Sequence, residues 1–220
     1  MSQNEFGIKI ILLGETGVGK TNLIRVFFGM EFKENFLSSS SSDCFEGELK
    51  YNDKSYKFFL WDTAGQEKYR AINKMFFRDA KIILIVYSIV DKHSFDEVDF
   101  WIKYVKENLK NEKYIIALIA NKNDLYEEQI VMDEDGKEVV EKYEIDFLTT
   151  SAKSDAVSFK EFVNRLIINY IKMTEGGESK EDKKDNLKIN KGYKNGGQKN
   201  KKCCWFEKYY FLILEVNKVN

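Results

Sequence analysis

The stretch that most constrains the fold of this chain is residues 8–21, IKIILLGETGVGKT. Residues 8–13 are mostly aliphatic and β-branched, which predicts a buried strand. Residues 14–21 then match the Gly-x-x-x-x-Gly-Lys-[Ser/Thr] pattern of a phosphate-binding loop. Residues 22–28 predict a helix, whose amino-terminal dipole favours a bound anion. Because the pattern follows a strand and opens a helix, we expect a bound phosphate rather than a glycine-rich turn without a ligand.

The residue types in this loop suit phosphate chemistry. Glycines allow the backbone to curl until successive N–H groups point at phosphate oxygens. Lys20 is expected to offer a point charge to β- and γ-phosphates, and Thr21 a hydroxyl to Mg²⁺. The loop therefore predicts a nucleotide site with a magnesium ion.

Composition narrows the class of protein. The chain has 220 residues, of which 43% are hydrophobic, enough for one domain with a packed core and an extension. Its net charge of −1 gives no reason to expect nucleic acid binding. The three cysteines (Cys44, Cys203 and Cys204) lack the spacing of a disulfide framework or a metal site, which favours a reducing compartment. The amino-terminal MSQNEFG is too short and polar for a signal peptide, and no apolar run approaches about 20 residues.

The remaining elements predict a sheet that is covered on both faces. Two strands joined at Asn52 and Asp53 are expected to form a hairpin. The amphipathic stretch at residues 94–111 predicts a helix whose apolar face belongs to the core. Strands alternate with helices after the hairpin, so we expect an α/β fold with a mostly parallel sheet. The expected strands are residues 44–51, 55–61, 81–88, 114–120 and 145–150, and a closing helix is expected at residues 159–171.

A second group of polar residues follows the strand at residues 55–61. Asp62 stands at the carboxyl end of that strand, where a carboxylate near a phosphate loop can associate with Mg²⁺. Gly65, three residues later, can bring a backbone N–H close to a γ-phosphate. Considered alone, Asp62 fits the N-cap of a helix equally well.

A third group, Asn121-Lys122-Asn123-Asp124, follows the strand at residues 114–120. An aspartate can accept hydrogen bonds from N1–H and the 2-amino group of guanine together, a pair that adenine does not offer. This loop therefore favours guanine as the base.

Four segments, GETGVGKT, WDTAGQE, NKND and SAK, occur in this order and resemble the four guanine-nucleotide motifs of the Ras superfamily. Within that superfamily, WDTAGQEKYRAINKMFFRDA, VYSIVDKHSF and a Lys-Lys-Cys-Cys segment resemble the Rab family most. The resemblance covers about residues 6–173 and implies a three-layer P-loop small G domain over residues 1–173. The sheet of such a domain would have six strands, mostly parallel with one antiparallel hairpin strand, and about five helices would cover it.

The resemblance also implies that the ligands are GTP or GDP and Mg²⁺. The backbone amides of residues 16–20 would hold the phosphates, and the aromatic ring of Phe32 would lie against the base. Lys122 and Lys153 would cover the base and ribose, and the Ala152 amide would bond to the guanine O6. The nucleotide-binding residues so implied are Thr16, Gly17, Val18, Gly19, Lys20, Thr21, Phe32, Ser39, Gly65, Asn121, Lys122, Asp124, Ser151, Ala152 and Lys153, and the magnesium ligands are Thr21, Ser39 and Asp62.

The same resemblance implies a slow GTPase that acts as a switch. Gln66 matches the glutamine that orients the attacking water, and no nucleophilic side chain takes part. Because no arginine is supplied in cis, an activating protein is expected to accelerate hydrolysis. An exchange factor, effector proteins and a prenyl escort protein are the other implied partners. The implied role is regulation of vesicle trafficking at the cytoplasmic face of an intracellular membrane, with a cytosolic pool.

The first switch departs from the family pattern. Where the resembling proteins have Thr-Ile-Gly before Val-Asp-Phe, this chain has Ser-Ser-Ser at residues 39–41 and Ser-Asp-Cys at residues 42–44. Ser39 keeps a hydroxyl for Mg²⁺ and an amide for the γ-phosphate, whereas Ser40 loses an apolar effector contact and Cys44 replaces an aromatic residue. One alternative is therefore a pseudo-GTPase scaffold that binds guanine nucleotide without cycling. A second, an ATPase or phosphotransferase with the same loop, conflicts with the guanine-reading residues.

Residues 174–220 are expected to form a disordered, lysine-rich tail. Residues 188–202 contain six lysines and no acids, a composition that favours an anionic membrane leaflet. Cys203-Cys204 resembles the Rab double-prenylation site, and two lipid groups are what stable anchoring requires. Residues 205–220, WFEKYYFLILEVNKVN, follow these cysteines, unlike in the family. We favour a mis-assigned stop or a retained intron after Cys204, and proteolytic trimming or an unprenylated protein held by its aromatic end stay open.

Overall fold

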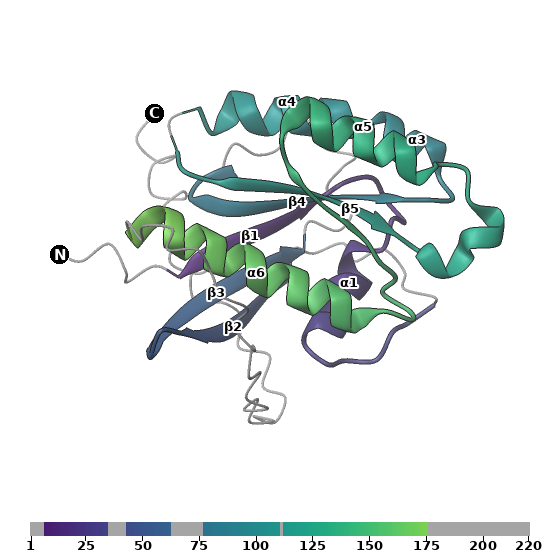
Figure 1. The fold of residues 1–220 in the computed structure, drawn as a ribbon. Coiled ribbons are helices and arrows are strands. Elements are labelled where there is room, and N and C mark those ends of the chain that lie inside the picture. Colours follow the sequence, from purple (N-terminus) through teal and green to yellow (C-terminus); the bar gives the residue numbers. More distant parts are fainter. Residues whose placement is uncertain (1–6, 35–42, 63–76, 111, 176–220) are drawn as a thin grey trace, which may run out of the picture. The chain divides into compact units, whose positions relative to one another are not determined.

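The computed structural model describes residues 7–34, 43–62, 77–110 and 112–175 (Figure 1). In this part of the chain a six-stranded sheet alternates with helices. The strands are β1 (Ile8–Leu13), β2 (Asp43–Tyr51), β3 (Lys54–Asp62), β4 (Ala80–Ser88), β5 (Ile115–Asn121) and β6 (Asp146–Thr149). The helices are α1 (Lys20–Phe27), α3 (Lys92–Asp96), α4 (Val98–Asn108), α5 (Asp133–Tyr143) and α6 (Ala156–Glu175), with a 3₁₀ helix η3 (Asn123–Glu128) after β5.

The sheet has the strand order β2-β3-β1-β4-β5-β6. Only β2 and β3 pair antiparallel, and every other neighbouring pair is parallel. The central strands β1 and β4 are mostly aliphatic and buried, because helices cover both faces of the sheet. The predicted α/β fold with a mostly parallel sheet and one antiparallel hairpin strand is confirmed.

Two hydrophobic cores lie on opposite faces of the sheet. The first packs α1 and α6 against one face, through residues such as Phe27, Phe159 and Leu166. The second packs α4 and α5 against the other face, through residues such as Ile102 and Val105 (Figure 1). The predicted three-layer arrangement is therefore confirmed.

The β2–β3 hairpin turns at the two residues expected from the sequence. Asn52 and Asp53 have φ values of 47° and 59°. Positive φ at both central residues matches the type I′ turn, whose twist suits two antiparallel strands. The hairpin prediction is confirmed.

The prediction of a single helix at residues 94–111 is wrong, because the chain forms two helices there. Helix α3 ends at Asp96 and α4 begins at Val98, with Glu97, whose ψ is −9°, between them. The short first helix is pinned to the end of β4: the Ser94 hydroxyl accepts from the Ser88 amide at 3.0 Å and donates to the Asp91 carbonyl at 2.7 Å. The apolar face nevertheless reaches the core as expected, since Val98 and its helical neighbours are buried.

Helix α5 and the 3₁₀ helix η3 were not expected from the sequence. The first turn of α5 is acidic, and the Asp135 carboxylate accepts from the Met132 amide at 2.8 Å, which satisfies one free N–H at the helix start. Gly136 lets α5 approach the sheet closely, since a Cβ there would lie 2.9 Å from both the Phe147 ring and the Tyr87 hydroxyl. The acidic residues of the first turn, followed by the apolar Val139, were the sequence features from which α5 could have been predicted.

Helix α6 continues to Glu175, beyond the end expected for the closing helix. The tail residues from 176 onward, including Cys203 and Cys204, lie outside the described residues. No helix in the described part of the chain combines the length and apolarity needed to cross a membrane.

Candidate nucleotide site

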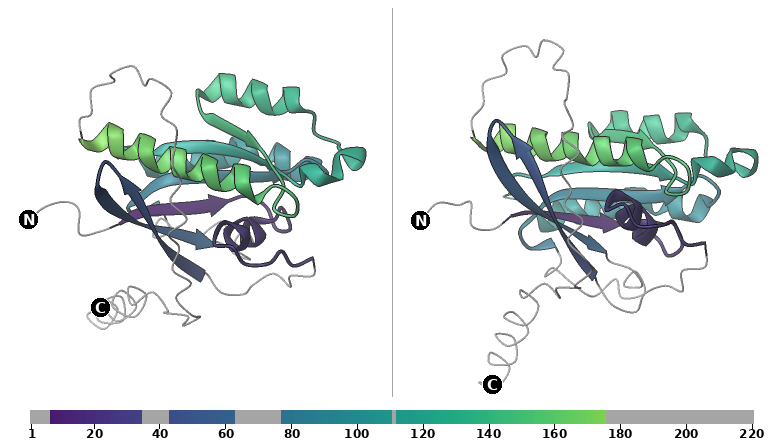
Figure 2. Two further views of the ribbon diagram at one scale, coloured as in Figure 1. Left: turned by 60° about the horizontal axis from the view of Figure 1, so that its bottom comes forward. Right: turned by 90° about the horizontal axis from the view of Figure 1, so that it is seen from below.

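The predicted site residues gather at the carboxyl edge of the sheet. The glycine-rich loop follows β1, Asp62 ends β3, and Asn121 ends β5. Because β1 and β3 are parallel neighbours, Asp62 pairs in register with Leu12, two residues before Gly14. Figure 2 shows the start of α1 and the loop before α6 at the same end of the sheet. Segments far apart in the sequence are thus brought to one place by strand order.

The glycine-rich loop is wound around the Lys20 side chain. The Lys20 ammonium donates to the carbonyls of Gly14 at 2.7 Å and Glu15 at 2.8 Å, and the residue is only 5% exposed. Gly14 has a φ of 133°, and a Cβ there would lie 2.0 Å from the Val86 carbonyl oxygen. A side chain at that position would therefore separate the loop from β4.

Thr21 and Asp62 place two oxygen atoms side by side. The Thr21 hydroxyl donates to the Asp62 carboxylate at 2.6 Å, and Asp62 is fully buried. A hydroxyl and a carboxylate are hard oxygen ligands of the kind Mg²⁺ prefers, so this pair fits the metal. The described residues contain no group of three or more His, Cys, Asp or Glu side chains that could hold a metal.

Asn121 joins the glycine-rich loop to the loop after β6. Its side-chain amide donates to the Val18 carbonyl at 2.7 Å and accepts from the Ala152 amide at 3.1 Å. A Cβ on Gly19 would lie 2.3 Å from the Asn121 amide nitrogen, so a glycine at that position permits the contact. One buried side chain thus braces both the expected phosphate site and the expected base site.

Asp124 lies beside the Ser151-Ala152-Lys153 segment. The Ser151 hydroxyl donates to the Asp124 carboxylate and accepts from the backbone amides of Lys153 and Ser154 at 3.0 and 3.1 Å. The Asn123 amide donates to the Thr150 carbonyl at 3.1 Å and ties the two loops together again. The predicted base-reading residues are therefore neighbours in space.

A contact that sequence reasoning missed lies in residues 31–34, which follow α1. Asn22 and Arg25 on α1 hydrogen-bond to the backbone of this segment, and the Glu34 carboxylate lies 2.9 Å from the Lys153 ammonium. The Glu34 carboxylate raises the pKa of Lys153. Phe32 packs, partly buried, against the core cluster that includes Val18 and Ala152. No sequence signal identifies these pairs, because they depend on the path of the chain after α1.

Other predicted site residues lie outside the described part of the chain. These are Ser39, Gly65 and Gln66, and their roles stay predictions.

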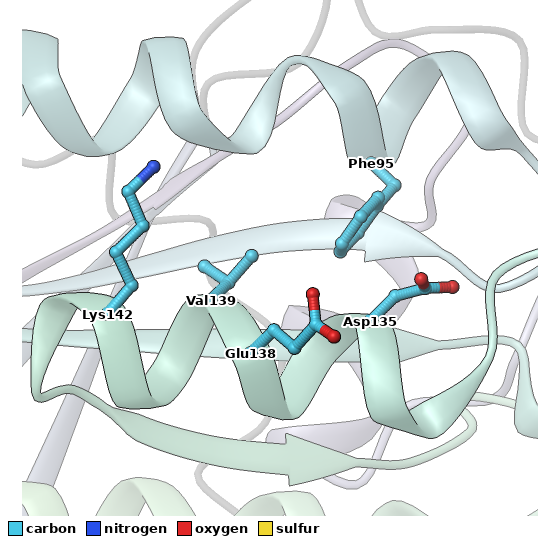
Figure 3. A pocket seen from close by; sticks show the side chains of 5 residues that line it. All are labelled: Phe95, Asp135, Glu138, Val139 and Lys142. Atoms are coloured by element: carbon cyan, nitrogen blue, oxygen red, sulfur yellow. The ribbon is translucent and has the colours of Figure 1, made fainter.

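A separate, shallow cavity of about 300 Å³ lies between α3 and α5 (Figure 3). It is lined by Phe95, Asp135, Glu138, Val139 and Lys142. In Figure 3 the Glu138 carboxylate points toward α3, whereas Lys142 extends toward α4, where its ammonium lies 2.7 Å from Asp99. None of the predicted nucleotide-site residues lines this cavity.

The comparison with known proteins identifies the family. The model of the Ras family matches residues 9–171. Ras-related protein Rab-11B of Dictyostelium discoideum is 40% identical over 144 residues, which cover 66% of this chain and 65% of that protein. Rab-26 of Rattus norvegicus is 34% identical over 151 residues, or 68% of this chain and 58% of that protein. SEC4 of Saccharomyces cerevisiae is 31% identical over 207 residues, which cover 90% of this chain and 91% of that protein.

The chain belongs to the Ras family, the class that its fold and the arrangement of its loops define. The relatives named above place it within that family among the Rab proteins. The aligned segments span less than two thirds of Rab-11B and of Rab-26, whereas the alignment with SEC4 spans nearly the whole of both chains.

Proposed function

We propose that this chain is a Rab-type small GTPase, which binds GTP and GDP and regulates vesicle trafficking according to which one it holds. The observation that carries the proposal is the pair of hydrogen bonds made by Asn121. They tie the glycine-rich loop, through Val18, to the loop that begins at Ser151, through Ala152. A phosphate site and a base site held together in this way suit one nucleotide that spans both.

Selection of guanine rests on Asp124. Its carboxylate would accept from N1–H and the 2-amino group of guanine, and the Ser151 hydroxyl holds the side chain in place. Adenine presents neither donor in that arrangement, so it would leave the carboxylate without its partners. Lys122 and Lys153 would cover the base and ribose, the Ala152 amide would bond to O6, and Phe32 would lie against the base.

The phosphates would bind at the amides of residues 16–20 and at the Lys20 ammonium. The Lys20 ammonium donates to the Gly14 and Glu15 carbonyls of its own loop, a position that supports this role. Thr21 and Asp62, with Ser39, would hold Mg²⁺, Asp62 through a water molecule. When bound, Mg²⁺ supplies charge stabilisation for the β- and γ-phosphate oxygens.

Hydrolysis would proceed by direct attack of water. The water oxygen forms a bond to the γ-phosphorus while the bond from that phosphorus to the β–γ bridging oxygen breaks, and GDP and inorganic phosphate leave. Gln66 would orient the water, and the Gly65 amide would contact the γ-phosphate. The protein contributes positioning and charge stabilisation only, so the intrinsic rate is expected to be slow and an activating protein to accelerate it.

The GTP-bound form would recruit effectors at the cytoplasmic face of an intracellular membrane. The membrane would be reached through prenylation of Cys203 and Cys204 and through the lysines of residues 188–202, after delivery by a prenyl escort protein. An exchange factor would reload the protein with GTP. Which organelle it serves depends on effector contacts that differ from the family pattern at residues 39–44.

One purification tests the proposed function. The protein is purified without added nucleotide, the bound nucleotide is identified, and its hydrolysis is followed with and without a Rab-activating protein. We expect GDP or GTP and a slow rate that the activating protein raises. Bound nucleotide that is never hydrolysed would favour the scaffold alternative, which the comparisons do not support, and equal affinity for ATP would refute guanine selection.

A further inference from the structure

A cluster of exposed apolar side chains lies between β5 and α5. Tyr126, on η3, is 66% exposed, and Ile130 and Met132, in the chain that leads into α5, are 56% and 52% exposed. The segment that carries them lies at the right-hand edge of Figure 1, beyond the end of the sheet. We call these three side chains the 126–132 patch. Contiguous apolar surface on a soluble protein is typical of a place where another molecule binds.

The backbone under the 126–132 patch is held in place by the residue that follows β4. The amides of Ile130 and Val131 both donate to the Ile89 carbonyl, at 2.9 and 3.0 Å, and Val131 is fully buried. Because Val131 enters the core, its neighbours Ile130 and Met132 are left facing solvent. The Gln129 side chain donates to the Val131 carbonyl at 2.8 Å and fixes the same stretch a second time. A patch on a fixed backbone loses little conformational entropy when a partner binds it.

Met132 stands at a position where a polar side chain is the usual choice. It is the N-cap residue of α5, where serine, threonine, aspartate or asparagine would accept a hydrogen bond from a free amide of the first turn. The thioether of methionine is a weak acceptor, so the start of the helix gives up this stabilisation. The Asp135 carboxylate supplies only the reciprocal bond, from the Met132 amide at 2.8 Å. An exposed side chain that serves neither the core nor the helix is explained if it contacts a partner.

Acidic residues surround the patch. Residues 123–138 contain seven acidic side chains and a single lysine, Lys137, which lies 3.9 Å from Glu134 and offsets one of these charges. The exposed acids next to the patch are Glu127, Glu128, Asp133 and Glu134. The potential over the patch is therefore negative, which disfavours an anionic membrane or a nucleic acid and favours a basic partner.

The cavity between α3 and α5 extends the same surface. Asp135, which bonds to the start of α5, also lines this cavity. Its apolar lining is Phe95 and Val139, and the Glu138 carboxylate points across it toward α3 (Figure 3). Lys142 turns its ammonium away, to a carboxylate of α4 at 2.7 Å. Lysine and arginine have an apolar stem and a cationic end, so a cavity with an apolar wall and two carboxylates suits either side chain.

We propose that the 126–132 patch and the acidic residues around it form a docking surface for a basic amphipathic segment of a partner protein. Apolar side chains of that segment pack on Tyr126, Ile130 and Met132, while its lysine or arginine side chains face the surrounding carboxylates and enter the cavity beside α5. The surface is small, so the contact is weak and transient. Its residues lie outside the predicted switches, so docking does not depend on which nucleotide is bound. The inference goes beyond the proposed function and does not rest on it.

The test measures binding of a fluorescein-labelled peptide to the full-length protein by fluorescence anisotropy. The peptide has about 18 residues of leucine and lysine, with the leucines along one face of a helix. One comparison peptide has the same composition with the leucines spread around the helix, and another has glutamate in place of lysine. At about 0.15 M salt we expect the parent to bind the basic amphipathic peptide at least roughly tenfold more tightly than either comparison peptide.

Met132→Ser separates docking from folding, because its two expected effects have opposite signs. Serine at the N-cap should raise the melting temperature by about 1–4 °C, whereas loss of the apolar side chain should weaken peptide binding by roughly fivefold. Tyr126→Ser should weaken binding by roughly tenfold. Glu128→Lys should weaken it by roughly fivefold, and this loss should shrink as salt is added.

Two variants on α6 serve as matched controls. Met173→Ser removes a methionine that is 39% exposed, and Glu161→Lys reverses the charge of an exposed acid. Both should bind the peptide as the parent does. The parent loaded with GDP and the parent loaded with a non-hydrolysable GTP analogue should also bind it equally. Melting temperatures of all variants report on folding.

Each outcome decides the proposal. Preferred binding of the basic amphipathic peptide that is weakened in Tyr126→Ser and Met132→Ser, and kept in both controls, supports it. Parent-like binding by these two variants overturns it, and so does equal binding of the comparison peptides or a preference for one nucleotide state. A parent dimer that Met132→Ser dissociates would make a second copy the occupant and overturn the basic partner. Peptide docking by a protein that binds no guanine nucleotide would refute the proposed function alone.

Discussion

Asn121 shows how one side chain at the carboxyl edge of the sheet serves structure before it serves a ligand. It is buried, and its amide group bonds on one side to Val18 and on the other to Ala152. Removal of that amide would leave two buried backbone groups without this partner, which typically costs more than the net value of a hydrogen bond. The buried hydrogen bonds of Asn121 therefore hold the loops of the expected guanine site in place.

At the same scale, Asp124→Asn is expected to change the preferred base. The new amide donor would face the donors of guanine and lower GDP affinity by roughly 100-fold, while the O2 acceptor of xanthine would suit it. Competition binding with GDP and xanthosine diphosphate measures the change. A variant that still prefers GDP would remove Asp124 from the base site.

Gln66→Leu is expected to slow hydrolysis by at least about tenfold, because the attacking water would lose the side chain that orients it. GDP affinity should change little, since the glutamine would act only on the reacting water. Single-turnover hydrolysis of bound GTP gives the rate. Equal rates for variant and parent would show that another group positions the water.

The lowered pKa of Lys9 is expected to make the stability of the folded protein depend on pH. Burial lowers the pKa of Lys9 to about 8, although its ammonium donates to the Arg78 carbonyl at 3.0 Å and lies 5.0 Å from the Trp61 ring centre. The unfolded chain, with a lysine pKa near about 10.4, binds more protons between about pH 8 and 10. The stability of the parent should therefore rise with pH over that range.

Lys9→Met removes this dependence, so the stability difference in favour of the variant should shrink by about 1–3 kcal/mol between pH 7 and pH 10. Urea unfolding at both pH values measures it. Lys50→Met, at an exposed position on β2, is the control for the loss of a lysine side chain. A constant difference for Lys9→Met would mean that Lys9 keeps its ordinary pKa.

At the scale of elements, Asp99 joins α4 to α5. Its carboxylate accepts from Lys142 at 2.7 Å and from the Tyr143 hydroxyl, and it pairs with Lys103 one turn along α4. The hydrogen bonds from Lys103, Lys142 and Tyr143 hold the pKa of Asp99 well below its usual range. Of these residues, Lys142 also lines the cavity between α3 and α5.

Asp99→Asn should lower the melting temperature at pH 7 by about 2–4 °C, a modest shift because the pair is partly exposed and screened by solvent. Since the folded pKa is depressed, the stabilisation is complete above about pH 4–5 and is lost as the pH falls below about 4. The difference from the parent should therefore be smaller at pH 3. Asp96→Asn, whose carboxylate pairs with Lys92 at 3.3 Å on the surface, serves as the control.

At the scale of the whole molecule, the prediction to test is prenylation of Cys203 and Cys204. If Cys203 and Cys204 are prenylated, the native protein should end near Cys204 and carry the mass of two geranylgeranyl groups. Intact-mass measurement of protein from the membrane fraction tests this prediction. Unmodified full-length protein in the soluble fraction would refute the lipid anchor.

In the whole molecule, the order of the strands brings the predicted site residues together. The glycine-rich loop, Asp62 and Asn121 are separated by tens of residues, and they meet because β1, β3 and β5 run parallel and end at one edge. Any loop on that edge is close to the others, whereas loops at the opposite edge are not.

The sequence by itself determined the fold class, the hairpin at Asn52 and Asp53, and the motifs at residues 14–21 and 121–124. Each of these depends on local chemistry: alternation or runs of apolar residues, positive φ, and glycines beside a lysine. Helix α5 was missed because its apolar positions are few and its packing depends on Gly136. The break at Glu97 was missed because a helical pattern runs through it.

Only the tertiary structure decided which side chains meet. The bonds from Asn22 to Lys33, from Glu34 to Lys153 and from Asn121 to Val18 join residues that no periodicity relates. Their partners are chosen by the path of loops and by the order of strands, and those follow from burial of the two cores as a whole. Local sequence specifies each element, whereas the contacts between elements are specified only when all of them pack together.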